Sequence, residues 1–247
     1  MTIEDEANES PFARFVFDPA VRFKSSLGSQ VYLELLERIQ RGELSSDDRI
    51  VDTTLAAELS VSRMPVREAL LRLSHEGYLV STTRGFMLPK LSHRDVAQIY
   101  EIRLLLEPRA AASAAQVISD RTLALMEEAQ QGMRTAAAGR DMKALIPKLI
   151  SFRQLWLRTV PNPRLAATIA RFIDQVQTVQ NGTLHNEAAL AEALQLSSDL
   201  LQAFKKRDAL AVQDLMTINL NRGREQFFLL SPGSDAGVGR ASESSEV

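Results

Sequence analysis

The sequence contains no cysteine among its 247 residues. This absence excludes disulfides, thiolate nucleophiles and cysteine-ligated metal sites, and it fits a protein of a reducing compartment. No apolar run reaches the ~18 residues of a membrane span, and the acidic start, MTIEDEANES, lacks the apolar core of a signal peptide. We therefore expect a cytoplasmic protein with no membrane partner.

Catalytic patterns are also missing. The three histidines, His75, His93 and His185, do not cluster by sequence spacing. The chain has neither a glycine-rich phosphate loop nor a Gly-x-Ser-x-Gly motif, so no familiar catalytic constellation can be assembled from it. We expect a protein that is not an enzyme.

Neither sign of charge is in large excess. The 29 Lys and Arg residues nearly balance 31 Asp and Glu, for a formal net charge of −2, so bulk charge does not attract nucleic acid. Apolar residues make up 45% and charged residues 24%, an ordinary globular balance for one or two domains. Residues 62–90, however, hold five Lys or Arg against two Asp or Glu. Any DNA binding must come from such a local patch.

The stretch SVSRMPVREALLRL, residues 60–73, reads as the turn and second helix of a helix-turn-helix. Ser62 is suited to cap the helix and Pro65 to its first turn. Arg63 and Arg67 are four residues apart, so they project together beside an apolar stripe. That stripe consists of Val66, Ala69, Leu70 and Leu73. Such a helix can dock on a core and present two guanidinium groups to a major groove, although solvated surface arginines show the same pattern.

The flanking chain favours the DNA-binding interpretation. A helix is expected over Leu27–Leu44, where Gly42 closes it, and a short second helix follows an N-cap at Asp52, Thr53 or Thr54. After the helix-turn-helix, Tyr78 and Val80 alternate before a turn, and Phe86 and Leu88 alternate after it, which predicts a β-hairpin wing with Arg84 at its tip. Three helices and this hairpin predict a winged helix-turn-helix over residues 27–90.

These residues closely resemble the DNA-binding domain of GntR-family bacterial transcription regulators. The matching segments are RIQRGEL, LAAELSVSRMPVREALLRLSHEGYLV and RGF. The resemblance implies a set of DNA-binding residues, namely Thr53, Ser62, Arg63, Met64, Pro65, Arg67, Arg84 and Gly85. Many relatives carry an arginine where this chain has Thr53, so we expect a weaker or altered base contact there.

In residues 91–230 the apolar residues recur almost throughout at helical spacing, which predicts an antiparallel helical bundle. A turn is expected at Asn181-Gly182, and Pro108 and Pro147 are expected to bend their helices. The expected helices are Asp95–Val117, Asp120–Ala138, Asp141–Val160, Leu165–Val179, Asn186–Lys206 and Asp208–Leu230. The fold class is thus mostly α. We expect residues 231–247 to be disordered, and residues 1–26 to form a flexible arm or one that packs on its own or a partner domain.

The second half resembles the helical FCD ligand-binding domain of the FadR-type branch of that family. The matches are EIRLLLEPRAA, FRQLWLRTVPNPRL and AFKKRDALAVQDLMTINL. Most such domains bind a divalent metal with one aspartate and three histidines, but the corresponding positions here are Leu149, Arg153, Ser197 and Asn219. Because none of these can replace the family ligands, we expect no metal and no other cofactor.

The same positions suggest an anion site. Arg153 replaces a metal ligand, and Arg103 comes from a helix that faces the cavity in relatives. We hypothesise that Arg103, Arg153, Ser197 and Asn219 bind an effector bearing a carboxylate or an acyl thioester. Two alternatives stay open: Glu107 or another carboxylate supplies the counter-charge, or Arg153 points to solvent and the bundle is simply packed.

The combined hypothesis is a transcription regulator, in the commoner family behaviour a repressor, that binds a pseudo-palindromic double-stranded operator as a homodimer. A metabolite in the helical domain would shift the operator-binding population. The alternative is an architectural or non-sensing dimeric DNA-binding protein whose helical domain only dimerises.

Overall fold

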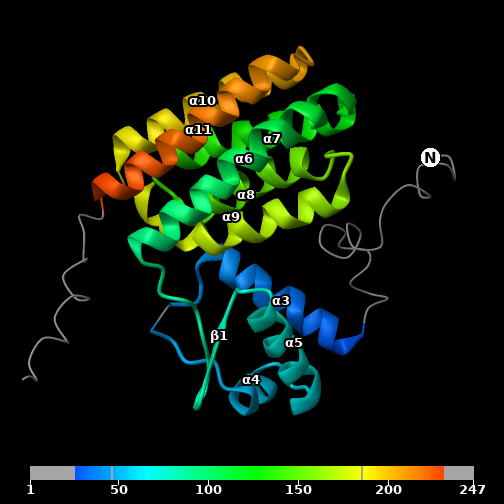
Figure 1. Ribbon diagram of the computed structural model, residues 1–247, viewed down its shortest axis with the longest axis vertical. Coiled ribbons are helices and arrows are strands. Elements are labelled where there is room, and N and C mark those ends of the chain that lie inside the picture. Colours follow the sequence, from blue (N-terminus) through cyan, green and yellow to red (C-terminus); the bar gives the residue numbers. More distant parts are fainter. Residues whose placement is uncertain (1–25, 46, 185, 231–247) are drawn as a thin grey trace, which may run out of the picture.

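The computed structural model describes residues 26–45, 47–184 and 186–230, with the backbone alone for residues 178–183. The expectations for most of the N-terminal arm and for the C-terminal tail lie outside these residues. The structure has a smaller N-terminal part, built from α3, α4, α5 and a hairpin, and a larger body built from α6 to α11 (Figure 1). We call them the N-terminal domain and the helical domain.

The N-terminal domain contains α3 (Leu27–Arg41), α4 (Asp52–Glu58) and α5 (Arg63–His75), followed by β1 (Val80–Thr82) and β2 (Gly85–Met87). The two strands pair antiparallel, so the predicted winged helix-turn-helix is confirmed. The residues that form its core come from the three helices, the segment before β1, and β2: Val31, Leu35, Leu36, Ile39, Leu55, Val66, Ala69, Leu70, Leu73, Tyr78, Leu79 and Phe86.

Several local predictions need correction. The first helix ends at Arg41 rather than Leu44, because Gly42 adopts a left-handed conformation with φ 70° and its N–H closes onto the last turn. In the hairpin, Leu79 is buried and Val80 is 48% exposed. The predicted alternation therefore placed Val80 on the wrong side, because the buried apolar pair at this point is Tyr78-Leu79.

The predicted helix caps are only partly right. Helix α4 begins at Asp52 with Val51 in the cap position, so Asp52, Thr53 and Thr54 lie in its first turn. The carboxylate of Asp52 instead accepts a hydrogen bond from another helix, as described below. Ser62 has the extended backbone of a cap residue, but its hydroxyl makes no capping hydrogen bond to α5.

The helical domain is the predicted bundle. Its elements are α6 (His93–Val117), α7 (Asp120–Ala138), α8 (Met142–Leu157), α9 (Pro163–Thr183), α10 (Glu187–Lys205) and α11 (Ala209–Leu230). Helix α6 starts two residues earlier than predicted, because Ser92 and Asp95 form a reciprocal capping box. The predicted turn at Asn181-Gly182 is wrong, since α9 continues to Thr183; an interior glycine costs a helix only about 1 kcal/mol.

Packing within the body places α6 against α11 and α9, and α7 against α8 and α10. Trp156, Tyr100 and Phe204 are among the largest fully buried side chains. Pro108 and Pro147 both lie inside helices. Among the described residues, no helix is long and apolar enough to span a membrane.

The two domains meet where α3 lies along α8 and α9 (Figure 1). In this view the wing and α4 are at the opposite end of the N-terminal domain, away from the helical body.

Candidate functional site

Helix α5 divides its side chains between core and solvent. Its apolar stripe is at most 2% exposed, whereas the side chains of Arg63 and Arg67 are 57% and 56% exposed. Met64 is exposed beside them and Pro65 is half-buried in the first turn. The stripe fixes the helix on its domain, so both guanidinium groups point outward on the same side as Met64.

A carboxylate from α4 holds these guanidinium groups together. Asp52 Oδ2 lies 2.9 Å from Arg63 Nε and 3.9 Å from Arg67 Nη1. The hydrogen bond from Arg63 holds the pKa of the Asp52 carboxyl below its ordinary value. Thr53, the next residue, is exposed near this pair on the first turn of α4. Sequence reasoning took Asp52 as a helix cap and missed its ion pairs.

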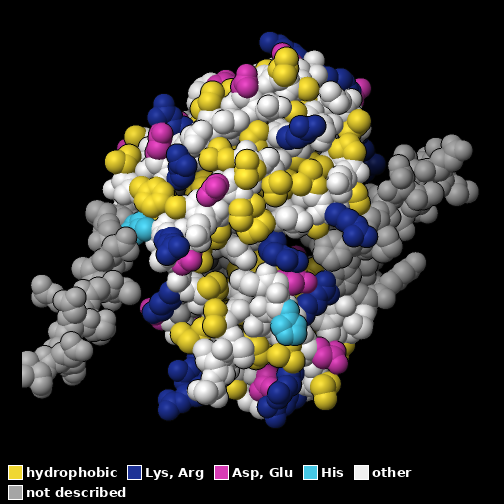
Figure 2. All heavy atoms as spheres, viewed as in Figure 1, with side chains coloured by type: hydrophobic (Ala, Val, Ile, Leu, Met, Phe, Trp, Pro, Cys, Tyr) yellow, Lys and Arg dark blue, Asp and Glu magenta, His cyan; other side chains and the backbone are white. Residues whose placement is uncertain are grey.

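The wing places Arg84 at its tip, in the turn between β1 and β2, where it is exposed to solvent. Thr82 Oγ1 accepts from the Arg84 backbone N–H and donates to the Gly85 carbonyl, which fixes the turn. Gly85 has φ 128°, and a Cβ there would lie 2.6 Å from the Ile50 carbonyl oxygen. Glycine is therefore required at this position by the fold itself. Figure 2 shows Lys and Arg side chains at the lower end of the molecule, over the ends of the hairpin and of α4 and α5.

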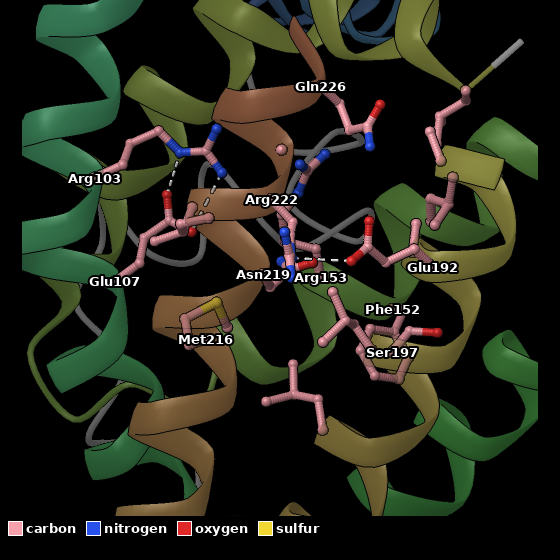
Figure 3. A pocket seen from close by; sticks show the side chains of 18 of the residues that line it. Arg103, Glu107, Phe152, Arg153, Glu192, Ser197, Met216, Asn219, Arg222 and Gln226 are labelled. Atoms are coloured by element: carbon pink, nitrogen blue, oxygen red, sulfur yellow. Dashed lines mark hydrogen bonds and ion pairs between the residues drawn. The ribbon is translucent and has the colours of Figure 1, made fainter. Parts of the chain in front are cut away.

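A second candidate site is a pocket inside the helical domain. It has a volume of about 180 Å³ and is lined from α6, α8, α9, α10 and α11 (Figure 3). The four predicted effector residues, Arg103, Arg153, Ser197 and Asn219, all line it. Residues 22 to 116 positions apart in sequence are thus brought together, as the resemblance implied. Leu149 lines the same pocket.

Arg103 is buried, with 4% of its side chain exposed, and forms an ion pair with Glu107 one turn along α6. Of the two sequence-based alternatives for its counter-charge, the structure shows a protein carboxylate. The pair does not satisfy the whole guanidinium group, because Arg103 Nη1 is buried without a hydrogen-bond partner. A buried donor of this kind is costly unless a ligand or water accepts from it.

Arg153 points into the pocket rather than to solvent. It is half-buried and donates a hydrogen bond to the amide oxygen of Gln177 on α9. Burial and the nearby charge of Arg103 lower its pKa to about 10. Within the part of the chain that the structure describes, no carboxylate lies in ion-pair distance of Arg153. The pocket therefore has more cationic than anionic capacity on this side.

The rest of the lining is neutral or apolar. Ser197 donates to the Leu194 carbonyl, 2.8 Å away, and Asn219 is half-buried on α11. At the pocket rim, Glu192 pairs with Arg222 at 3.0 Å. Sequence reasoning missed this rim pair, and nothing in its spacing marks it. The apolar wall includes Leu149, Phe152, Trp156, Leu200 and Met216.

The pocket does not offer a metal its usual ligands. The family ligand positions hold Leu149, Arg153, Ser197 and Asn219, of which one has no donor atom and one is a cation. Among the described residues, no group of three or more His, Cys, Asp or Glu side chains could hold a metal ion.

A winged helix with outward-facing arginines, joined to a helical domain, is an architecture of bacterial transcription regulators. Family models agree with this class. Residues 27–86 match the model of the gntR family of bacterial regulatory proteins, and residues 98–222 match the FCD domain. The chain belongs to the GntR family, in the group that carries an FCD domain.

Individual relatives point the same way. The chain is 29% identical over 190 residues to the HTH-type transcriptional regulator McbR of Escherichia coli, covering 74% of this chain and 84% of McbR. It is 43% identical over 84 residues to the gluconate operon transcriptional repressor of Bacillus subtilis, covering 34% of this chain and 35% of that repressor. The solved structure of McbR superposes with a TM-score of 0.75 and 27% identity, covering 83% of this chain and 99% of McbR.

Proposed function

We propose that this transcription regulator binds a pseudo-palindromic operator as a homodimer through α5 and the wing, and that a small anionic metabolite in the helical-domain pocket controls this binding. The exposed, paired positions of Arg63 and Arg67 on α5 carry the DNA-binding half of the proposal. Like the gluconate operon relative, which is named a transcriptional repressor, it would block transcription when bound.

The proposed DNA-binding surface, formed by α5, the start of α4 and the wing, makes contacts to base edges and contacts to the sugar-phosphate backbone. Arginine can donate two parallel hydrogen bonds to the O6 and N7 atoms of guanine. The exposed side chains of Arg63 and Arg67 would make such contacts. Met64 and Ser62 are exposed on the same turn, where they can contact bases or sugar-phosphate. Arg84 at the wing tip is placed to meet a phosphate or the minor groove. Thr53, shorter than the arginine of many relatives, would contribute only a weak contact.

Selection of DNA from a random pool by the purified full-length chain tests this half. We expect enrichment of an inverted repeat whose half-sites are about one helical turn, 10–10.5 bp, or a multiple of it apart, because each α5 reaches only a few base pairs. Enrichment of no sequence, or of sequences without dyad symmetry, would contradict the proposed homodimeric reader.

The effector half rests on two cations of the pocket, the buried Arg103 and the half-buried Arg153. Arg103 retains an unpartnered Nη1, and Arg153 donates its hydrogen bond to the neutral amide of Gln177, with no carboxylate of the described residues in ion-pair distance. A carboxylate between them would accept from both guanidinium groups, while Ser197 and Asn219 would orient its neighbouring atoms. An apolar cavity of about 150 Å³ holds benzene, so a pocket of about 180 Å³ favours a small organic acid over an acyl thioester.

Calorimetric titration with a panel of small organic acids tests this assignment. We expect binding heat with the wild type and its loss in Arg153→Ala, with Arg121→Ala, an exposed arginine on α7, as the matched control. Equal heats in wild type and Arg153→Ala would end the idea. We also propose that the pocket takes no divalent metal, which equilibrium dialysis with Zn²⁺ checks.

The second candidate function is a non-sensing regulator whose helical domain only dimerises. The replaced metal-ligand positions favour it, since a pocket that has lost its family ligand need not have gained another. A thermal-shift screen separates the two, because a bound ligand raises the melting temperature. A screen of small acids in which none raises the melting temperature would favour the non-sensing protein.

A further inference from the structure

A single buried carboxylate joins the two domains. Asp174 Oδ2, on α9, accepts hydrogen bonds from Gln40 Nε2 of α3 at 3.0 Å and from the Tyr78 hydroxyl at 3.2 Å. Asp174 is 7% exposed, so these bonds lie inside the domain junction. The same oxygen therefore ties two separate segments of the N-terminal domain to the helical domain.

The Tyr78 end of this junction lies directly between the DNA-facing elements. Tyr78 follows α5 by three residues and precedes β1 by two. Gly77 beside it has φ 82°, and a Cβ there would lie 2.8 Å from Nε2 of Gln175 on α9. The segment that links α5 to the wing is thus in contact with α9 at both Gly77 and Tyr78.

The pocket lies at the next turn of the same helix. Gln177, three residues after Asp174, lines the pocket and accepts the hydrogen bond from Arg153. Burial raises the pKa of Asp174 to about 6, against the opposing effects of the Gln40 bond, the Arg153 charge, the Tyr78 bond and the Arg103 charge. Both pocket arginines therefore help to keep the junction carboxyl ionised.

We infer that Asp174 and Gln177 transmit occupancy of the pocket to the DNA-binding elements, a step that rests on the anionic effector of the proposed function. A ligand carboxylate that binds Arg153 breaks the hydrogen bond from Arg153 to Gln177 and neutralises the cation that stabilises the Asp174 anion. The Asp174 anion is then less stable in the closed junction at pH 7, and opening the junction to water relieves that cost. The junction loosens, and α5 and the wing gain freedom relative to the helical body.

Hydrogen exchange of the full-length chain at pH 7 tests this route without a ligand. Arg153→Gln removes the charge that a ligand would neutralise, and Gln177→Glu places a carboxylate beside Arg153 as a fixed substitute for the ligand. We expect either variant to speed amide exchange in residues 27–41 and 76–80 by about tenfold, the factor that corresponds to one pKa unit of lost charge stabilisation at Asp174. Helix α7 serves as the internal reference, and Arg121→Gln as the matched control.

The Asp174→Asn background makes the test specific. If the charge of Asp174 carries the signal, Arg153→Gln will speed exchange less than about twofold in that background. Two results would overturn the inference. One is an equal acceleration by Arg153→Gln in the wild-type and Asp174→Asn backgrounds, and the other is no acceleration by Arg153→Gln and none by Gln177→Glu in the wild-type background. Should Arg153→Gln fail to fold, Gln177→Glu still tests the inference, because this variant keeps Arg153 and gives it a carboxylate partner.

A separate arm distinguishes this inference from the effector proposal. Trp156 lines the pocket and is the only tryptophan of the sequence, so its fluorescence reports occupancy by sodium benzoate as a probe. Benzoate that changes the fluorescence and speeds junction exchange in the wild type but not in Asp174→Asn supports the coupling. Benzoate that changes the fluorescence without altering exchange overturns the coupling and leaves the effector pocket standing. Accelerated exchange in the two variants without benzoate binding supports the coupling and counts against this class of effector.

Discussion

Replacing Asp174 with asparagine should change how the stability of the protein depends on pH. The carboxyl is buried, and its pKa is raised from 3.8 to about 6. Between pH 3.8 and about pH 6, the folded state therefore keeps a proton on Asp174 that the unfolded state has released. Its contribution to stability is therefore fully present below pH 3.8 and is lost as the pH rises to about 6. Each unit of pKa shift corresponds to about 1.36 kcal/mol, so the whole loss of stability is about 3 kcal/mol.

Asparagine has the same shape, keeps an oxygen that accepts from Gln40 and Tyr78, and does not titrate. The free energy of unfolding of Asp174→Asn should accordingly rise relative to the wild type by about 2 kcal/mol between pH 4.5 and pH 7. This slope is more informative than the absolute difference, which also includes the fit of the new amide group.

Urea unfolding of both proteins, followed by Trp156 fluorescence at equal protein concentrations across this pH range, measures the difference. Asp214→Asn, the same change at an exposed position of α11, is the control and should run parallel to the wild type. Parallel curves for Asp174→Asn and wild type would refute the reasoning, because they would show that Asp174 has the same pKa in the folded and unfolded states.

Three further substitutions test other parts of the structure. Gly85→Ala should lower stability by about 1–3 kcal/mol, measured by thermal unfolding, because its φ of 128° and the adjacent backbone carbonyl leave no room for a Cβ; an unchanged melting temperature would contradict this. Glu107→Gln should cost about 3–5 kcal/mol, because Arg103 would remain buried without its counter-charge, and a loss below 1 kcal/mol in urea unfolding would mean that water or another group replaces it. Asp52→Asn should strengthen binding to non-specific DNA and weaken operator discrimination by about 1 kcal/mol, because Arg63 loses the carboxylate that orients it; competition binding that shows neither change would refute this role.

The local pattern of apolar residues was sufficient to predict a helix whose one apolar face packs on a single core. The spacing of Val66, Ala69, Leu70 and Leu73 placed α5 correctly, because these side chains need only be apolar and on one stripe. The pocket residues were found from a family pattern rather than from periodicity, since nothing local indicates that Arg153 and Asn219 face each other across a bundle.

The junction could not be predicted in this way. Asp174 occupies an interior position of an otherwise amphipathic helix, where a carboxyl is ordinarily assigned to solvent. Its partner Gln40 is 134 residues away, so its burial depends on how two domains pack. The wing shows the same limit on a smaller scale: Tyr78 and Leu79 are both buried because the chain leaves α5 through Gly77 before the strand alternation begins.

The central claim is that two guanidinium groups on α5 read base edges. The most direct test is the ratio of affinities for the selected operator and for a scrambled duplex, at one fixed salt concentration, for wild type, Arg63→Ala, Arg67→Ala and the control Arg121→Ala. Each α5 variant should lose about 1–3 kcal/mol of discrimination, roughly a 5- to 150-fold fall in this ratio, while the control keeps it. A ratio unchanged in both α5 variants would contradict the account.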